Sequence, residues 1–342
     1  MNKKNILLSL LLFIIMIMFV SCEKKTEETV KTVNITPGRK YPIRVGYMPD
    51  FSGTSAVAIA KQNGYFDEEN LDVTLIEFSD GPSEIEEMLL KNLEFAYIGH
   101  GAHSLAIEGK VNVLFPNGLS RSEQIIVRND AQIESVKDLR GKKVGTQLGT
   151  SSEILLYLAL QSLGIKTNDV EIINMNGNSI VSSMMDNNID AASVQAPYTF
   201  EIFNSLGDKV KSIATTVDYS DVGSFPSSWV VTPSFQSNNT DIVNRFSRAI
   251  LKAMDYRQLN MSEVVKMVAD MNGKTVEEVD LERETGLWFS GDDVKKAYID
   301  GDASKWYKTQ QDIFIYTKTI TNKVDINNYV QIKYMINNVF NE

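Results

Sequence analysis

The stretch KVGTQLGTSSEILLYLALQSLG (residues 143–164) contains the pattern that decides the fold. Residues 143–146 favour a short strand. Residues 150–163 favour a long amphipathic helix that ends at Gly164, because glycine commonly follows the last helical turn. A strand that leads directly into a helix is the repeating unit of α/β proteins, and the same unit recurs on both sides of this stretch.

The pattern predicts alternating strands and helices through the first two-thirds of the chain. The predicted strands are residues 43–48, 71–78, 95–98, 111–115, 124–127, 143–146, 170–174, 191–194 and 229–231. The predicted helices are residues 54–62, 83–92, 100–108, 150–163, 179–187 and 198–206, and the last third is mainly helical. Ser83 and Glu86 have the spacing of a capping box at one helix start. We therefore expect an α/β fold with mostly parallel sheets flanked by helices.

The N-terminus indicates export. Lys3 and Lys4 precede an apolar run at residues 6–20. At about 15 residues this run is shorter than the roughly 17–25 residues that a membrane-spanning helix needs. We interpret residues 1–21 as a signal peptide that is not part of the fold.

Cys22 is the one cysteine in the 342 residues and follows the apolar run directly. Its position resembles that of the lipidated cysteine in a bacterial lipobox, although Phe19 stands where leucine is usual. The alternative is an ordinary cleaved signal with an incidental cysteine. Residues 22–41 are mostly polar and are expected to form a flexible tether.

The remaining chain of about 300 residues is long enough for two lobes of ordinary domain size. The full sequence has a hydrophobic content of 43% and a charged content of 23%, which are typical of globular proteins. The formal net charge is −10, or −12 after loss of Lys3 and Lys4. Nucleic-acid binding depends on basic surfaces, so this charge argues against a nucleic-acid partner. It does not define the charge of a ligand, because a cleft sets its own local potential.

Residues that could support catalysis are few. His100 and His103 are the only histidines, and Cys22 precedes the folded part. A zinc site needs three or four ligands, so we expect no metal and no cofactor. The sequence contains no GxSxG nucleophile elbow and no GxxxxGK[ST] or GxGxxG phosphate loop. These observations favour a binding protein over an enzyme.

Three strand-to-helix junctions are candidates for ligand contact, namely residues 50–54 (DFSGT), 99–102 (GHGA) and 149–152 (GTSS). Ligands of open α/β sheets bind beyond the carboxyl ends of the strands. The first turn of a helix also offers unpaired N–H groups to an anion. Thr150 and Glu153 have capping-box spacing, so the alternative is that Thr150 only caps its own helix. The positions of the junctions suggest a cleft between two lobes.

Several motifs resemble type 2 periplasmic binding proteins. Residues 43–73 contain IRVGY, AKQNGYF and LDV, which resemble the opening of such proteins. Residues 135–145 (SVKDLRGKKVG) resemble the DLKGKK entry to the second lobe in the nitrate/sulfonate/taurine (NMT1/THI5-like) branch. Residues 189–198 contain IDAA and QAPY, similar to a VDA…P segment at the cleft, and residues 149–152 stand at the anion-binding helix start. The resemblance covers about residues 43–231.

This resemblance implies two α/β lobes joined by two crossing segments, near residues 124–129 and 226–232, that close around a ligand by a hinge motion. Lobe 1 would comprise residues 42–127 and 226–342, including the C-terminal helices. Lobe 2 would comprise residues 128–225.

The resemblance also implies a set of ligand-binding residues, carried over by position. These are Ser52, Gly53, Thr54, His100, Gly101, Thr150, Ser151, Ser152, Pro197, Tyr198 and Trp229, with Ser228 as an alternative to Trp229. His100 replaces a small polar residue and would donate to an anion or stack on a ring; the alternative is a solvated loop histidine. Tyr198 is the aromatic candidate, with a place in the core as its alternative.

The function implied by the resemblance is that of a solute-binding protein anchored in the cell envelope through Cys22, facing the periplasm or the exterior. We expect a monomer that delivers a small anionic or polar solute, such as a sulfonate, taurine or nitrate, to the permease and ATPase of an ABC importer. The alternatives are a receptor for a thiamine pyrimidine precursor and a ligand-sensing lipoprotein. A thiamine-pyrimidine synthase would need a cysteine-rich motif, and the folded part of this chain contains no cysteine.

Overall fold

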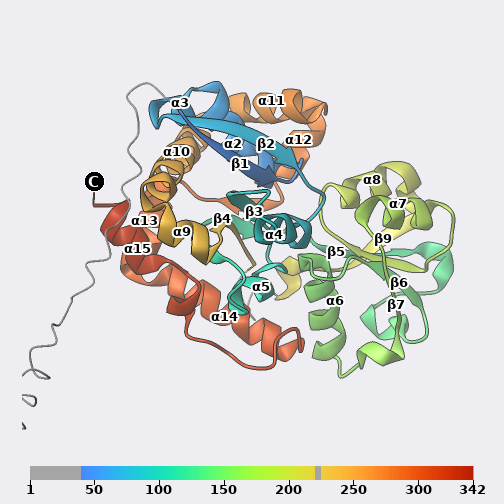
Figure 1. Cartoon of the computed structure of the whole chain (residues 1–342). Helices are drawn as coiled ribbons and strands as arrows, with labels where there is room; N and C mark the ends of the chain where they lie inside the picture. Colours follow the sequence, from blue (N-terminus) through green and yellow to red (C-terminus); the bar gives the residue numbers. More distant parts are fainter. Residues whose placement is uncertain (1–39, 220–224, 342) are drawn as a thin grey trace, which may run out of the picture. The chain divides into compact units, whose positions relative to one another are not determined.

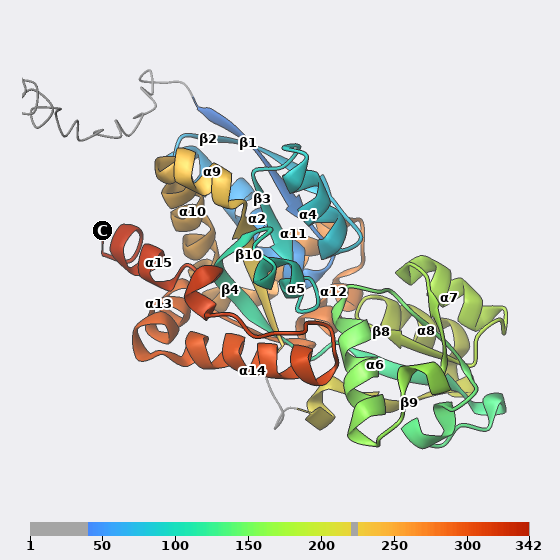
Figure 2. The same ribbon diagram turned by 60° about the horizontal axis from the view of Figure 1, so that its bottom comes forward.

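Two β-sheets flanked by helices form the framework of the protein (Figures 1 and 2), as the α/β pattern predicts. The computed structural model describes residues 40–219 and 225–341. The predicted signal peptide, Cys22 and nearly all of the predicted tether therefore lie outside the described residues.

The first sheet has six strands in the order β11-β4-β10-β3-β1-β2. Its strands are β1 (Tyr41–Tyr47), β2 (Leu71–Glu77), β3 (Phe95–Ile98), β4 (Asn112–Ser120), β10 (Pro226–Val231) and β11 (Gly286–Trp288). β1 is parallel to both β2 and β3, whereas β10 is antiparallel to its neighbours. The connecting helices are α2 (Phe51–Gln62), α3 (Tyr65–Glu68) and α4 (Gly81–Leu89). The carboxyl ends of β1, β2 and β3 therefore meet at one edge of the sheet.

The second sheet has five strands in the order β7-β6-β8-β5-β9. Its strands are β5 (Gln124–Arg128), β6 (Lys143–Thr146), β7 (Glu171–Asn174), β8 (Ala191–Val194) and β9 (Val210–Thr215). β6 is parallel to β7 and β8, while β5 is antiparallel to β8 and β9. The flanking helices are α6 (Ser151–Ser162), α7 (Gly177–Met185) and α8 (Tyr198–Leu206). Both sheets thus contain a three-stranded parallel unit linked by helices.

The last third of the chain is mainly helical, as its composition predicts. Its helices are α9 (Pro233–Asn238), α10 (Thr240–Leu259), α11 (Met261–Asn272), α12 (Val276–Arg283), α13 (Gly291–Asp300), α14 (Asp302–Tyr316) and α15 (Ile332–Asn338). α10 and α11 pack on α2, and α14 contacts both β10 and α6, close to the short helix α5 (His103–Ile107) (Figures 1 and 2). None of the helices in the described ranges has both the length and the apolar character needed to span a bilayer.

The chain leaves the six-stranded sheet after Ser120 of β4 and enters the five-stranded sheet at Gln124 of β5. It leaves that sheet after Thr215 of β9 and is back in the six-stranded sheet at Pro226 of β10. Residues 124–127, which the sequence analysis assigns to the end of the first lobe, form part of β5 and pair within the five-stranded sheet. β5 is hydrogen-bonded to β8 and β9 along its length, so the whole strand belongs to the five-stranded sheet. Residue 226, where the predicted return to the first lobe begins, starts β10 of the six-stranded sheet.

An aromatic cluster forms the core of the six-stranded sheet. Trp229 on β10 is fully buried, and its ring lies edge-on to those of Tyr97 and Phe246. The ring of Phe246, on α10, also stacks on that of Phe95, with 3.9 Å between the ring centroids. Aromatic pairs of this kind contribute about 0.5–1.5 kcal/mol beyond their burial. They hold α10 and the strands that carry the cavity residues in fixed positions.

Candidate ligand-binding site

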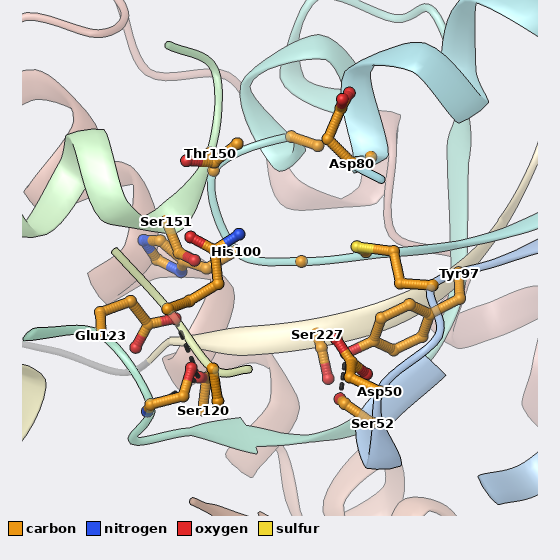
Figure 3. A pocket seen from close by; sticks show the side chains of 18 of the residues that line it. Asp50, Ser52, Asp80, Tyr97, His100, Ser120, Glu123, Thr150, Ser151 and Ser227 are labelled. Carbon is orange, nitrogen blue, oxygen red and sulfur yellow. Dashed lines mark hydrogen bonds between the residues drawn. The ribbon is translucent and has the colours of Figure 1, made fainter. Parts of the chain in front are cut away.

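A cavity of about 100 Å³ lies at the carboxyl ends of the parallel strands (Figure 3). This volume is several times what one water molecule needs, so a small organic molecule or several waters fit inside. Loops that follow β1, β2 and β3 line one side, and loops that follow β6 and β8 line the other. The site occupies the place that the strand-to-helix junctions predict.

Most of the residues predicted from the sequence line this cavity. They are Ser52, His100, Gly101, Thr150, Ser151, Pro197 and Tyr198. These residues come from three junctions far apart in the sequence and from the start of α8. The structure brings them together, while their contacts with a ligand stay predictions.

Gly53 and Thr54 lie outside the cavity lining, on the side of α2 that packs against the chain after β1. A Cβ atom at Gly53 would lie 2.5 Å from the backbone oxygen of Met48. The hydroxyl of Thr54 donates to that same oxygen at 3.0 Å. Because α2 begins at Phe51, the helical rotation turns these two residues away from the cavity that Ser52 faces.

Ser152 and Trp229 also lie outside the lining. The Ser152 hydroxyl donates to the side-chain oxygen of Gln195, so Ser152 supports a cavity residue from behind. On β10 it is Ser227 that reaches the cavity, and Trp229 lies two residues deeper, under Tyr97. Because each residue of a strand advances the chain by about 3.4 Å, Trp229 lies beyond the cavity wall that Ser227 reaches, in the core. Ser228 is buried and donates to or accepts from His103 and Tyr307.

Two of the helix starts at the cavity are closed by their own acidic residues. Asp50 is the N-cap of α2, and its carboxylate accepts from the Gly53 amide at 2.7 Å. Asp80 is the N-cap of α4 and accepts from the Ser83 amide at 2.8 Å. Ser83 is therefore not the capping residue that its spacing predicts. Each carboxylate satisfies an amide that would otherwise be free for an anion.

The start of α6 differs, because Thr150, its N-cap residue, makes no side-chain capping bond. The Thr150 hydroxyl donates to the backbone oxygen of Gln147 at 2.7 Å. The Glu153 carboxylate accepts from the Gly149 amide at 2.7 Å, not from that of Thr150. The predicted capping box is thus wrong. The first turn of α6 keeps its amides uncapped by side chains at the cavity wall.

His100 is buried in the cavity wall and holds a neutral ring. Burial, with a smaller effect of the neighbouring His103, lowers the pKa of His100 well below its usual value. Nδ1 of His100 lies 3.0 Å from the side-chain nitrogen of Gln310. Nε2 is buried and has no hydrogen-bond partner among the described residues, and the side chain is only 1% exposed. His100 is therefore a buried part of the wall and not a solvated loop histidine.

Asp50 is an acidic group on the opposite wall. Figure 3 shows Asp50, Ser52, Tyr97 and Ser227 gathered on one side of the cavity, with Thr150, Ser151 and His100 on the other. Burial and the negative charge of Glu282 raise the pKa of Asp50 to about 7.

Beneath this wall, Glu84 is fully buried, and neither carboxylate oxygen has a partner among the described residues. Burial, followed by the charges of Asp80 and Asp50, raises the pKa of Glu84 well above its usual value.

Loops from the two sheets touch at the cavity rim. Gln147 donates from Nε2 to Asp80 Oδ2 at 2.7 Å. Gly101 lies so close to the start of α6 that a Cβ atom there would be 2.2 Å from the carbonyl carbon of Thr150. These contacts enclose the cavity between the two sets of loops.

Sequence reasoning missed several lining residues, among them Asp80, Tyr97, Glu123, Ser227, Glu282 and Trp288. Asp80 carries a local signal, because it precedes a helix at a strand end. Glu282 lies on α12 and Trp288 on β11, in the part of the chain read only as helical, and nothing near them in the sequence indicates a site. In residues 40–219 and 225–341, no group of three or more His, Cys, Asp or Glu side chains is arranged to hold a metal ion.

A family model described as "NMT1/THI5 like" matches residues 53–260. The chain belongs to the NMT1/THI5-like family. A Brucella abortus member named "Putative binding protein" is 30% identical over 84% of this chain and 89% of its own. A Bacillus subtilis member named "Putative aliphatic sulfonates-binding protein" is 28% identical over 84% of this chain and 85% of its own.

Among solved structures, the alkanesulfonate-binding protein SsuA from Xanthomonas axonopodis pv. citri, bound to MOPS, has the same fold. The TM-score is 0.65, with 16% identity, and the match covers 85% of this chain and 98% of that one. This NMT1/THI5-like chain therefore has the fold of periplasmic binding proteins, and its reported relatives are named as binding proteins.

Proposed function

We propose that this protein is the extracytoplasmic solute-binding component of an ABC importer and captures one small polar solute without chemical change. The family and its named binding proteins support this function. The cavity supports it as well, because its walls come from two sheets linked by only two crossings. We place the hinge at residues 121–123, between β4 and β5, and at residues 216–219, which follow β9.

The observation that carries the proposal is the uncapped first turn of α6 at the cavity wall. Ser151 and Thr150 line the cavity, and no side chain caps their turn. The helix dipole places partial positive charge there, so an acceptor group of the solute would bind without a cationic side chain. A sulfonate, the ligand class named for a relative, has such acceptor oxygens.

A thiamine pyrimidine precursor is the second candidate solute. Three aromatic side chains, Tyr97, Tyr198 and Trp288, line the cavity, and flat rings pack well against aromatic faces. A pyrimidine ring nitrogen would accept from the first turn of α6 in place of a sulfonate oxygen.

The membrane attachment rests on the sequence. We propose that Cys22 carries a lipid and that residues 22–41 tether a monomer to the envelope, within reach of a permease and its ATPase. A role in signalling would use the same cavity and anchor. Detection of stimulated transport in reconstituted vesicles would separate import from signalling.

The test is a thermal-shift panel of sulfonates, nitrate, bicarbonate, phosphonates and pyrimidines. A ligand at 100 times its dissociation constant should stabilise the protein by about 2.7 kcal/mol. Ser151→Asp places a negative charge in the first turn of α6, where acids suit the helix dipole, so the fold should persist while acceptor groups are repelled. Asn178→Asp, exposed in the first turn of α7, is the matched control. Retained binding in Ser151→Asp would contradict the proposed site.

A further inference from the structure

Arg257 places a fully buried guanidinium in the last turn of α10. It continues the stripe of buried side chains that includes Phe246, Ile250 and Ala253, at a position where the helical periodicity predicts another apolar residue. Burial lowers the pKa of Arg257 to about 10, so the group is still protonated at pH 7. A positive charge therefore lies where an apolar side chain would complete the stripe.

The hydrogen bonds that this guanidinium makes within the described ranges all go to neutral oxygens. Nη1 donates to the Ser55 hydroxyl at 2.9 Å and to Asn117 Oδ1 at 3.1 Å. Nη2 donates to the backbone oxygens of Asn117 at 3.1 Å and Phe289 at 2.8 Å. Buried charges are normally paired, and replacing a buried ionic group by a well-packed apolar residue is often neutral or stabilising. The packing of α10 alone therefore does not account for an arginine at this position.

The acceptors of Arg257 lie on three separate segments. Ser55 is on α2, Asn117 is on β4, and Phe289 directly follows β11. A guanidinium has five N–H donors in a rigid planar fork, so one side chain joins the three segments in a fixed geometry. Its central carbon also lies 5.8 Å from the centre of the Trp288 ring, within the range of a cation–π interaction.

Two of these segments contribute side chains to the cavity lining, Ser52 from α2 and Trp288 from β11. Asn117 accepts from Arg257 and donates from Nδ2 to the backbone oxygen of Ser52 at 3.0 Å. The hydroxyl of Ser52 is hydrogen-bonded to that of Tyr97 in the cavity wall (Figure 3). Arg257 and Asn117 are not among the described residues that line the cavity. They act on it through the residues that they hold.

We propose that Arg257 is a positioning residue of the solute site, which fixes Ser52 through Asn117 and fixes the ring of Trp288 through its own charge. The inference rests on the proposed function, because it assigns a role at the same cavity. Arg257 does not touch the solute. It sets where a hydroxyl and an aromatic ring of the wall stand before the solute enters, and a site that is ordered beforehand loses less entropy on binding.

Arg128 on β5 is a buried arginine with a different set of partners. It is 9% exposed, pairs with Asp130 and donates from Nη1 to the backbone oxygen of Met184 at 2.6 Å. Neither Arg128 nor these partners are among the described residues that line the cavity. Arg128 thus has the carboxylate partner that Arg257 lacks, and it provides a matched control.

Asn117→Asp separates the positioning of Ser52 from the stability of the fold. The new carboxylate would face the guanidinium of Arg257 and form a charge-assisted pair with it, so the fold should persist. The same change removes the N–H donor to Ser52 and sets a charged oxygen against the backbone oxygen there. We expect the affinity to fall about fivefold or more.

Arg257→Lys keeps the positive charge but replaces the planar fork by a compact ammonium, which cannot reach all three segments at once. The affinity should again fall about fivefold or more. Arg128→Lys should lower thermal stability and leave the affinity unchanged. Affinities would be measured by calorimetry with ethanesulfonate, nitrate and 4-aminopyrimidine, using those that the unchanged protein binds.

The ring of Trp288 gives a readout that needs no ligand. The chain contains three tryptophans, Trp229, Trp288 and Trp306. Protein labelled with 5-fluorotryptophan would be studied by ¹⁹F NMR, with each resonance assigned by a single replacement of tryptophan by phenylalanine. The resonance of Trp288 should shift or broaden in Arg257→Lys, whereas that of Trp306 should not. Arg128→Lys should change neither.

Unchanged affinity in either Arg257→Lys or Asn117→Asp would overturn the positioning role, and so would an unchanged Trp288 resonance in Arg257→Lys. An equal loss of affinity in Arg128→Lys would overturn it as well, because lower stability would then explain the weaker binding. If the unchanged protein binds none of the three compounds, that result counts against the proposed function. The Trp288 resonance then still decides whether Arg257 positions the ring.

Discussion

Replacement of Gly101 by alanine should weaken ligand binding without unfolding either sheet. A Cβ at this position would lie 2.2 Å and 2.4 Å from the carbonyl carbon and oxygen of Thr150, and 2.7 Å from the amide nitrogen of Ser151. Non-bonded heavy atoms prefer about 3.5–4.0 Å. All three neighbours are backbone atoms, so no side chain can rotate to make room.

The added methyl group therefore has to push the loop after β3 more than about 1 Å away from the start of α6. Overpacking of this kind costs about 1–3 kcal/mol. If this free energy destabilises only the arrangement in which the two sets of loops touch and enclose the ligand, the affinity decreases about 5-fold to 150-fold. Each sheet with its own helices stays intact, because the clash lies between the two sets of loops.

Gly99 offers a matched control in the same loop. An added Cβ there has no atom within 4 Å, so Gly99→Ala should leave the loop in place beside α6. Because Gly99 also lines the cavity, this variant measures the effect of one added methyl group without the backbone clash. Affinity would be measured by calorimetry with the tightest ligand of the panel, and compaction on binding by small-angle scattering. Equal affinity and equal compaction in Gly101→Ala and Gly99→Ala would show that this approach of backbone to backbone is not needed for binding.

Four further perturbations test other parts of the reasoning. Gly177→Ala would place a Cβ 2.1 Å from the ring of Tyr198, so the ring should leave its position and affinity should fall at least fivefold in the same titration. The pKa of Asp50 is raised to about 7, so Asp50 holds its proton more tightly in the folded than in the unfolded state. Between about pH 4 and 7 its contribution to the free energy of unfolding therefore decreases as pH rises, by at most about 1.4 kcal/mol per pH unit. Denaturant titrations should show that Asp50→Asn gains stability relative to the unchanged protein across this window, and parallel curves would contradict the raised pKa. Thr150→Asp should close the first turn of α6, raising helix stability by about 1 kcal/mol while abolishing binding; a binding-competent, stabilised variant would remove the role of this turn. Cys22→Ala should move the protein from the membrane fraction to the soluble fraction of cells, and an unchanged distribution would exclude lipidation.

The fold follows closely from local patterns. The alternation of strands with helices in residues 43–206 is strong because the inner strands, such as β3 and β8, are buried on both faces and helices must cover them. β11 was not predicted, since its three residues (Gly286–Trp288) are too few to show periodicity. β5 was predicted as a strand but placed in the wrong sheet, because sheet membership depends on pairing partners far away in sequence.

The candidate site was predictable only in part. Ser52, His100 and Thr150 follow strands, and the carboxyl-end rule places such residues at the cavity without knowledge of side-chain directions. Glu123 and Glu282 follow no such rule, because they reach the cavity through the crossing and through α12. A position near a junction also does not determine which way a side chain points. Thr54 and Trp229 lie near such junctions, but their side chains are buried in the core.

The three helix starts at the cavity look alike in the sequence but have opposite electrostatic effects. The residue before α2 and the residue before α4 are aspartates whose carboxylates accept from amides of their own helix and offset the positive end of its dipole. The residue before α6 is a threonine whose hydroxyl donates to the backbone of Gln147, so that helix keeps its positive end. One cavity thus contains two helix starts that are closed by their own side chains and one that stays open. The identity of a single N-cap residue, Asp or Thr, decides whether a helix start is left open for an acceptor group of the proposed solute.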